Sequence, residues 1–107
     1  VANCDLAIAT MESRFAVSGI NLGLFCSTPA VPLSRNLSRK QAMRMLLTGD
    51  FISAEQAQTY GLINDAVNNN ELKQATMDLA HKIAAKSPLA IKLGKQMFYQ
   101  QFHDYRQ

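Results

Sequence analysis

The sequence predicts an α/β fold that is mostly helical and contains a few short strands. Short apolar runs near the start of the chain are bounded by polar turn residues, which is typical of strands. A serine followed three residues later by glutamine occurs at Ser38 and at Ser53, and this spacing marks the beginning of a helix. Apolar residues then recur at helical spacing through the C-terminal part of the chain.

Length and composition place the chain among globular domains. Its 107 residues suffice for one small domain with a single core, and 48% of them are hydrophobic. No apolar run approaches the ~20 residues of a membrane helix, so we expect no membrane span. The first residues, VANCDLAIAT, lack the basic start and long apolar region of a signal peptide. Because this opening is abrupt and apolar, we expect Val1 to lie inside a structural element of a larger domain.

The N-terminal elements are expected to be extended. Residues 4–9, CDLAIA, predict a strand, and residues 10–13 predict a polar turn. A second short strand is expected over residues 14–17, and Ser18-Gly19 ends it. The apolar run of residues 20–25 suits extended backbone that lines a pocket.

A short helix that ends near Asn36 is expected next. Pro29 and Pro32 argue against a regular helix that crosses both, because proline has no amide hydrogen to donate inside a helix. A helix with either proline in its first turn is allowed, and Thr28 could cap a helix that begins at Pro29.

Two capped helices follow. Ser38 and Ser53 are the expected N-caps, each with a glutamine placed to complete a capping box. Gly49 and Gly61 are expected to end these helices in the left-handed conformation. Residues 62–67 then predict a short strand or an extended link.

The C-terminal part is expected to form two amphipathic helices. One of the three asparagines at 68–70 should cap the first helix, whose apolar face carries Leu72, Ala75, Leu79 and Ile83. Ser87-Pro88 predicts the cap and first residue of the second helix. Ile91, Phe98 and Phe102 form its apolar stripe.

Few residues offer chemistry by themselves. His81 lies on the polar side of its predicted helix, His103 lies near the C-terminus, and neither has the partners that a catalytic base needs. Cys4 and Cys26 show neither metal spacing nor a CxxC motif, which favours two reduced thiols in apolar surroundings. Cys26 follows an apolar run and is either a pocket thiol or a buried small hydrophobe.

The basic residues allow two interpretations. Arg35, Arg39, Lys40 and Arg44 form a cluster without an acid inside it, which suits either phosphate binding or a solvated helix face. The spacing of Ala57, Gly61 and Val67 also fits a helix-turn-helix loosely. The recognition helix would then be NDAVNNN, which is rich in poor helix formers, so we expect no nucleic acid partner.

Four stretches together resemble the crotonase superfamily, the enoyl-CoA hydratase/isomerase family. They are CDLAIAT, GINLGL after Phe15, LSRNLSRKQAMRMLLTGDFISAEQAQTYGLINDAV and KSPLAIKLGKQMF, and they cover nearly the whole chain. The most family-specific part is LTGDFISAEQAQTYGLIN. The loop GLFCSTPAV is most similar to the subgroup of enoyl-CoA hydratase domain-containing protein 3.

The resemblance implies the domain organisation. Residues 1–107 would be a partial crotonase domain, with residues 1–36 at the end of a spiral of ββα turns and residues 37–107 as core-flanking and C-terminal helices. The oxyanion-hole peptides and the first catalytic glutamate of the hydratases would precede Val1. The last family helices would follow Gln107. We therefore expect the chain by itself to be inactive.

The resemblance also implies where the site lies. Aligning Cys4-Asp5 and Phe15 with the family places its second glutamate at Gly19, so ordinary paired-glutamate hydration is in doubt. Glycine at this position resembles the naphthoyl-CoA synthase branch, whose loop carries an aspartate where this chain has Cys26, and a thiol is a poor substitute for that base. Gly19 and Cys26 are the candidate pocket positions, and Leu24 and Phe25 would bind the acyl group.

The family resemblance implies the ligands and the assembly. The partner would be an acyl-CoA thioester, with coenzyme A as part of the substrate and no separate cofactor or metal. The full-length domain would form a homotrimer or hexamer in the bacterial cytoplasm or, alternatively, in the mitochondrial matrix. Two further hypotheses remain: a non-catalytic acyl-CoA-binding or assembly subunit, and a small DNA-binding domain.

Overall fold

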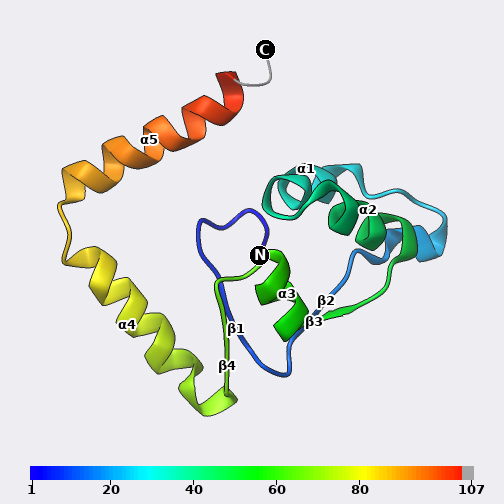
Figure 1. The fold of residues 1–107 in the computed structure, drawn as a ribbon, viewed down its shortest axis with the longest axis horizontal. Helices are drawn as coiled ribbons and strands as arrows, with labels where there is room; N and C mark the ends of the chain where they lie inside the picture. Colours follow the sequence, from blue (N-terminus) through cyan, green and yellow to red (C-terminus); the bar gives the residue numbers. More distant parts are fainter. Residues whose placement is uncertain (105–107) are drawn as a thin grey trace. The chain divides into compact units, whose positions relative to one another are not determined.

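The computed structural model describes the backbone of residues 1–104 and the side chains of residues 1–102, so the side chain of His103 lies outside the described residues. The described chain is mostly helical with a few short strands, as predicted (Figure 1). It divides into two compact units, Val1–Ala75 and the residues from Thr76 onward. The strands and the candidate site residues all lie in the first unit.

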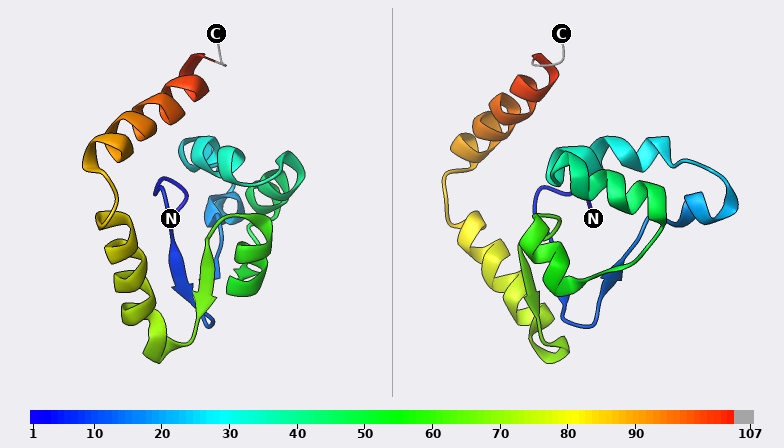
Figure 2. Two further views of the ribbon diagram at one scale, coloured as in Figure 1. Left: turned by 60° about the vertical axis from the view of Figure 1, so that its left-hand side comes forward. Right: turned by 45° about the vertical axis from the view of Figure 1, so that its right-hand side comes forward.

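Two pairs of short strands join distant parts of the first unit. β1 (Ile8–Thr10) pairs in parallel with β4 (Asp65–Val67), and Ala9 lies opposite Ala66. β2 (Arg14–Phe15) pairs antiparallel with β3 (Ile52–Ser53). Figure 2 shows β1 and β4 side by side. Each pair therefore connects the N-terminal segment to a strand that comes after a helix: β3 follows α2, and β4 follows α3.

Both N-terminal strands are shorter than the sequence predicts. β1 begins at Ile8 rather than Cys4, because residues 1–5 form a turn in which the Cys4 amide donates to the Val1 carbonyl (3.0 Å). Pairing begins at Ala7, whose amide donates to the Asn64 side chain (2.9 Å) and whose carbonyl accepts from the Asn64 amide (2.8 Å). β2 ends at Phe15, two residues before the expected boundary.

The expectation of extended backbone over residues 20–25 is wrong. Ser18–Leu22 forms a 3-10 helix, η1, and Gly23 follows it with φ 81°, a left-handed conformation that glycine adopts without steric cost. The amide of Gly23 donates to the Ile20 carbonyl (3.0 Å), and the amide of Leu24 donates to the Gly19 carbonyl (3.0 Å). These local bonds satisfy the backbone without a neighbouring strand.

α1 (Ser27–Asn36) ends where predicted and has Pro29 in its first turn, the arrangement that the sequence allows, although it also continues across Pro32. Pro29 lies in the first turn, where an amide has no partner inside the helix, so only Pro32 removes a helical hydrogen bond. Cys26, rather than Thr28, occupies the N-cap and makes no side-chain cap bond. Nδ2 of the Asn36 side chain donates to the backbone carbonyls of Pro32 (2.7 Å) and Ala2 (2.8 Å). The second bond links the end of the helix to the N-terminal turn.

α2 (Arg39–Thr48) and α3 (Ala54–Tyr60) begin and end as predicted. Ser38 accepts from the Gln41 amide (3.3 Å), and Ser53 accepts from the Gln56 amide (3.1 Å). At Ser53 the box is complete, because the Gln56 side chain also accepts from the Ser53 amide (2.9 Å). Gly49 and Gly61 end the two helices with φ of 68° and 91°.

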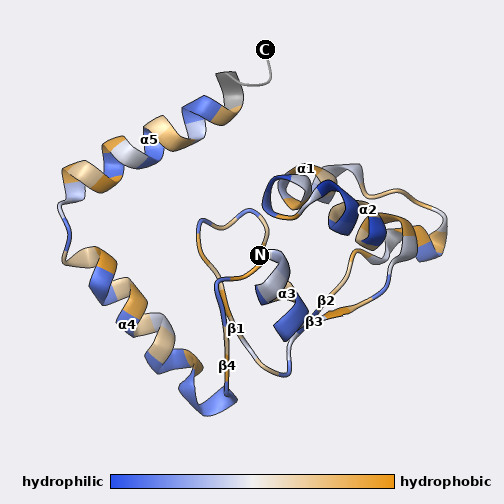
Figure 3. Ribbon diagram, in the orientation of Figure 1, coloured by the Kyte–Doolittle hydropathy of each residue, from blue (hydrophilic) through white to orange (hydrophobic). Residues whose placement is uncertain are grey.

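The C-terminal helices are α4 (Leu72–Ala84), which follows the 3-10 turn η2 (Asn69–Glu71), and α5 (Pro88–Asp104). Asn68 occupies the N-cap position of η2 without a side-chain cap bond, so the expected asparagine cap does not form there. Ser87 does cap α5, since it accepts from the Ala90 amide (3.2 Å). Hydrophobic and hydrophilic residues alternate along both helices (Figure 3). The predicted apolar face of α4 is half-buried. In the predicted stripe of α5, Ile91 and Phe102 are half-buried and Phe98 is exposed.

The core of the first unit lies between α1, α2, β3 and α3. None of the buried residues that form this core is polar. Burial of each large aliphatic side chain contributes roughly 1.5–3 kcal/mol against exposure. The buried cluster consists of Leu33, Leu37, Ala42, Met45, Leu46, Ile52, Ala57, Leu62 and Ile63.

The helix-turn-helix hypothesis is wrong. After α3 the residues of the expected recognition helix form a bend, the strand β4 and the start of a 3-10 turn. The structure therefore offers no helix at this place that could enter a DNA groove. Within residues 1–104, no helix has the length and apolar character to cross a membrane.

The complete capping box makes Ser53 a testable contributor to stability. We expect Ser53→Ala in the full-length protein to lower the free energy of unfolding by about 1 kcal/mol, because the Gln56 amide loses its acceptor. Chemical denaturation measures this change. The control is Ser34→Ala, which removes an exposed hydroxyl that donates to the Val31 carbonyl within α1 (2.8 Å). We expect a change below about 0.5 kcal/mol for the control, and equal losses in the two variants would contradict the role of the cap.

Candidate functional site

The candidate site is the loop from Ser18 to Cys26, which closes on itself through backbone hydrogen bonds. Besides the two bonds of the Gly23 and Leu24 amides, the Ser27 amide donates to the Phe25 carbonyl (3.0 Å). The Ala30 amide donates to the Cys26 carbonyl (3.2 Å), which joins the loop to the first turn of α1. The loop is thus a compact turn rather than the extended pocket wall that the sequence predicts.

This closure brings the two candidate pocket positions into contact. A Cβ atom built on Gly19 would collide with Sγ of Cys26 and would lie 3.2 Å from the Leu24 carbonyl oxygen. Both residues are half-buried, and Cys26 packs against the hydrophobic core. No side chain fits at position 19 while the thiol stays where it is.

The two residues predicted to bind the acyl group lie at the surface of the loop. Leu24 is 65% exposed and Phe25 is 49% exposed. They follow the left-handed Gly23 and lie between the two pocket positions in the sequence. Two adjacent exposed apolar side chains are available to contact a ligand or another part of the protein.

The exposed Asn21 side chain of η1 lies against the end of α2. Gly49, the left-handed residue that ends α2, leaves space that the Asn21 side chain fills: a Cβ on Gly49 would lie 2.7 Å from Nδ2 and 2.8 Å from Oδ1 of Asn21. The position of η1 therefore depends on a glycine far from it in the sequence. Sequence reasoning did not detect this contact, because nothing in the pattern pairs Asn21 with Gly49.

An apolar hollow of about 470 Å³ lies next to the loop. Phe15, Val17 and Leu33 contribute to its lining, and Ser18 continues the lining up to Gly19. Arg14 lies at the same hollow with its guanidinium carbon 4.4 Å from the centre of the Phe51 ring, a cation–π contact. The four predicted site residues themselves do not line it. Sequence analysis missed Phe51, which carries no pattern that separates it from other exposed apolar residues.

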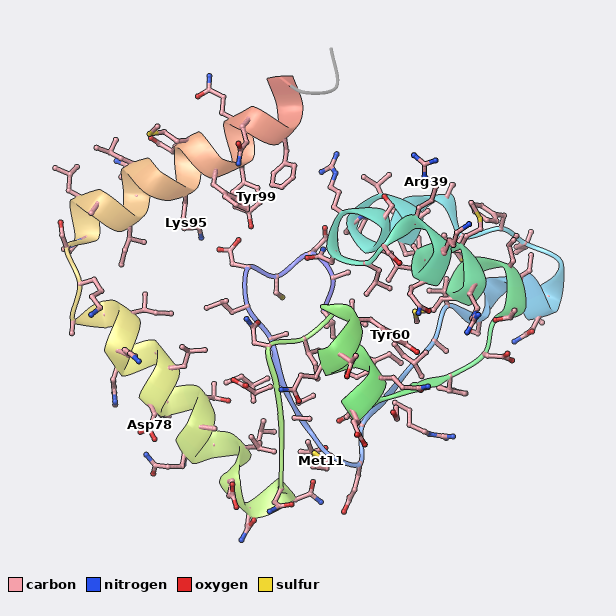
Figure 4. The ribbon with its side chains drawn as sticks, viewed as in Figure 1. Met11, Arg39, Tyr60, Asp78, Lys95 and Tyr99 are labelled. Carbon is pink, nitrogen blue, oxygen red and sulfur yellow. The ribbon has the colours of Figure 1, made fainter. Side chains whose placement is uncertain are left out.

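The remaining candidates stay at the surface. Both cysteines are free thiols, but Cys4 is exposed in the N-terminal turn, which corrects the prediction of an apolar environment for it. His81 is exposed, as expected. The basic residues Arg35, Arg39, Lys40 and Arg44 are all exposed, and Figure 4 shows the Arg39 side chain directed away from its helix. Among the described residues, no group of histidine, cysteine and acidic side chains could hold a metal ion.

Comparison with known proteins identifies the family. The model of the enoyl-CoA hydratase/isomerase family matches residues 1–107, the whole chain. The chain belongs to the enoyl-CoA hydratase/isomerase family. It is 50% identical over 101 residues to the human mitochondrial enoyl-CoA hydratase domain-containing protein 3, which confirms the predicted subgroup. That alignment covers 94% of this chain and 33% of the human protein, so the chain spans about a third of the length of such relatives.

Solved structures of the enoyl-CoA hydratase/isomerase family agree with the fold. An enoyl-CoA hydratase from Mycobacterium smegmatis superposes with a TM-score of 0.92 at 52% identity, covering 94% of this chain and 39% of that protein. The human enoyl-CoA hydratase domain-containing protein 3 superposes with a TM-score of 0.90 at 48% identity, with coverage of 94% and 40%. These matches confirm that the described elements are part of a crotonase fold.

The contact between Asn21 and Gly49 yields a stability test. We expect Gly49→Ala in the full-length protein to lower the free energy of unfolding by at least about 1–2 kcal/mol, because alanine is strained at positive φ and its methyl group would displace Asn21. The control is Gly94→Ala in α5, where nothing lies within 4 Å. Alanine there should raise stability by about 1 kcal/mol through its helix propensity. Denaturant unfolding measures the free energy of unfolding of both variants. An unchanged value for Gly49→Ala would contradict the strained turn and the close contact with Asn21 at this position.

Proposed function

We propose that the protein containing this chain binds an acyl-CoA thioester and acts on it by stabilising an enolate oxyanion. Membership of the enoyl-CoA hydratase/isomerase family supports the acyl-CoA part of this proposal. A relative from Thauera aromatica, 38% identical over 96 residues, is an (E)-benzylidenesuccinyl-CoA hydratase. Hydrogen-bond donors placed in advance toward the developing negative charge would supply the stabilisation.

The observation that defines the site is the collision between any side chain at position 19 and the Cys26 thiol. Glycine has no group that holds or delivers a proton, so position 19 cannot serve as the acid or base of a paired-carboxylate hydration. In our proposal, Gly19 and Cys26 form part of the acyl site, and Leu24 and Phe25 contact the acyl chain. Coenzyme A enters as part of the substrate, without a separate cofactor.

The second candidate function is a non-catalytic acyl-CoA-binding or assembly subunit of the same fold. The missing acid at position 19 favours it, because such a subunit needs no proton transfer. Exposed apolar residues on α5, among them Leu89, Leu93 and Met97, suit burial in an assembly. For the full-length protein we propose a homotrimer or hexamer. The mitochondrial relatives support a mitochondrial location, and both the matrix and the bacterial cytoplasm stay predictions.

Restoring a carboxylate separates the two functions. Gly19→Glu alone would meet the Cys26 thiol, so the test combines Gly19→Glu with Cys26→Ala in the full-length protein. If the site retains its catalytic geometry, this double variant should hydrate crotonyl-CoA at least about 10²-fold faster than wild type, the contribution typical of a positioned acid or base. Loss of the enoyl absorbance measures the rate.

The matched control combines Gly19→Gln with Cys26→Ala, which has nearly the same shape but no ionisable group. We expect this control to show no comparable gain. Equal rates for the glutamate and glutamine variants, with crotonyl-CoA still bound in calorimetry, would contradict the catalytic proposal and support the binding subunit. Failure of the wild-type protein to bind crotonyl-CoA would contradict the catalytic proposal and the acyl-CoA-binding subunit, and would leave the assembly subunit.

A further inference from the structure

Position 19 lacks a side chain for a reason that its backbone does not explain. The three glycines with positive φ are Gly23, Gly49 and Gly61, so Gly19 adopts a conformation open to other residues. The space in which its Cβ would lie is filled by Sγ of Cys26. At Gly23 and Gly94, by contrast, nothing lies within 4 Å of an added Cβ. The obstacle to a side chain at position 19 is therefore steric, and it comes first from Sγ of Cys26 and second from the Leu24 carbonyl oxygen at 3.2 Å.

The loop fixes the backbone of both residues. Cys26 occupies the N-cap of α1, and its carbonyl accepts from Ala30. At the other end of the loop, the carbonyl of Gly19 accepts from the Leu24 amide. These bonds fix the backbone on both sides, and Cys26 packs against the hydrophobic core. The thiol can therefore make room for a side chain at position 19 only by rotating about its Cα–Cβ bond, away from its place in this packing.

We propose that Gly19 and Cys26 are a sterically coupled pair in which the thiol replaces the missing side chain and forms the wall of the acyl site at this point. The functional half of this inference rests on the proposed acyl-CoA binding. Cysteine behaves as a small hydrophobic residue, so the wall suits an apolar, uncharged acyl group near the thioester. The size of residue 26 then determines how bulky that acyl group is.

The steric coupling is tested by thermal unfolding of the full-length protein. Gly19→Ala is introduced into wild type and into the Cys26→Ala background, which lacks the sulfur atom. We expect the melting temperature to fall by at least about 3 °C in the first case and by less than about 1 °C in the second. The matched control is the Cys4→Ala background, which removes the other thiol and should leave the full loss in place. Equal losses in all three backgrounds overturn the coupling.

The specificity is tested with ligands that differ by branching near the thioester. Calorimetry compares the Kd values of butanoyl-CoA, 2-methylbutanoyl-CoA and free CoA. We expect Cys26→Ala to improve the binding of the branched relative to the straight acyl group by at least about fivefold, because it frees the volume of one heavy atom. The Kd of free CoA should not change, and Cys26→Ser should retain the wild-type ratio.

The melting temperatures and the ligand affinities test separate parts of the proposal. An unchanged ratio of the two acyl-CoA affinities in Cys26→Ala overturns the pair as part of the acyl site. If wild type binds no acyl-CoA, the proposed function fails, whereas the melting temperatures still decide whether the pair is coupled.

Discussion

The fold depends on two left-handed glycines that reverse the chain after α2 and α3. Gly49 and Gly61 have φ of 68° and 91°, and the strands β3 and β4 follow them. Each reversal returns the chain to an N-terminal strand, so that β3 pairs with β2 and β4 pairs with β1. Both glycines also leave room for a close neighbour. The Asn21 side chain lies at Gly49, and the Asn36 carbonyl oxygen would be 3.1 Å from a Cβ built on Gly61. Larger residues would disturb the turn and the neighbouring segment together.

Elements specified by local chemistry are predictable from the sequence. The caps at Ser38, Ser53 and Ser87 and the glycines that end helices depend on residues three to four positions apart. Such local patterns can be recognised in the sequence. The strand boundaries and η1 are different, because they depend on long-range pairing. β1 begins where Asn64 reaches Ala7, a contact that no local pattern contains. Residues 20–25 are apolar enough for a strand, but Gly23 permits a tighter local turn that satisfies the backbone without a partner.

The geometry of the candidate site was not predictable from the sequence, and its position stays a prediction. The family resemblance pointed to Gly19 and Cys26 as separate positions in a pocket wall. Only the folded loop brings the thiol against the glycine, since this contact depends on the closure of η1 and on the start of α1. The adjacent apolar hollow was not predicted, because its lining comes from segments far apart in the sequence, such as Phe15, Leu33 and Phe51. We therefore relate the missing acid at position 19 to Cys26, whose Sγ occupies the space that a side chain at position 19 would need.

The measurement that tests this account most directly is a crystal structure of the full-length protein with a non-hydrolysable thioether analogue of butanoyl-CoA. We expect the acyl chain to lie against Cys26 at the face of Gly19 and to contact Leu24 or Phe25. Electron density that places the acyl chain away from the loop of residues 18–26, with the Cys26 thiol no longer against Gly19, would contradict the account.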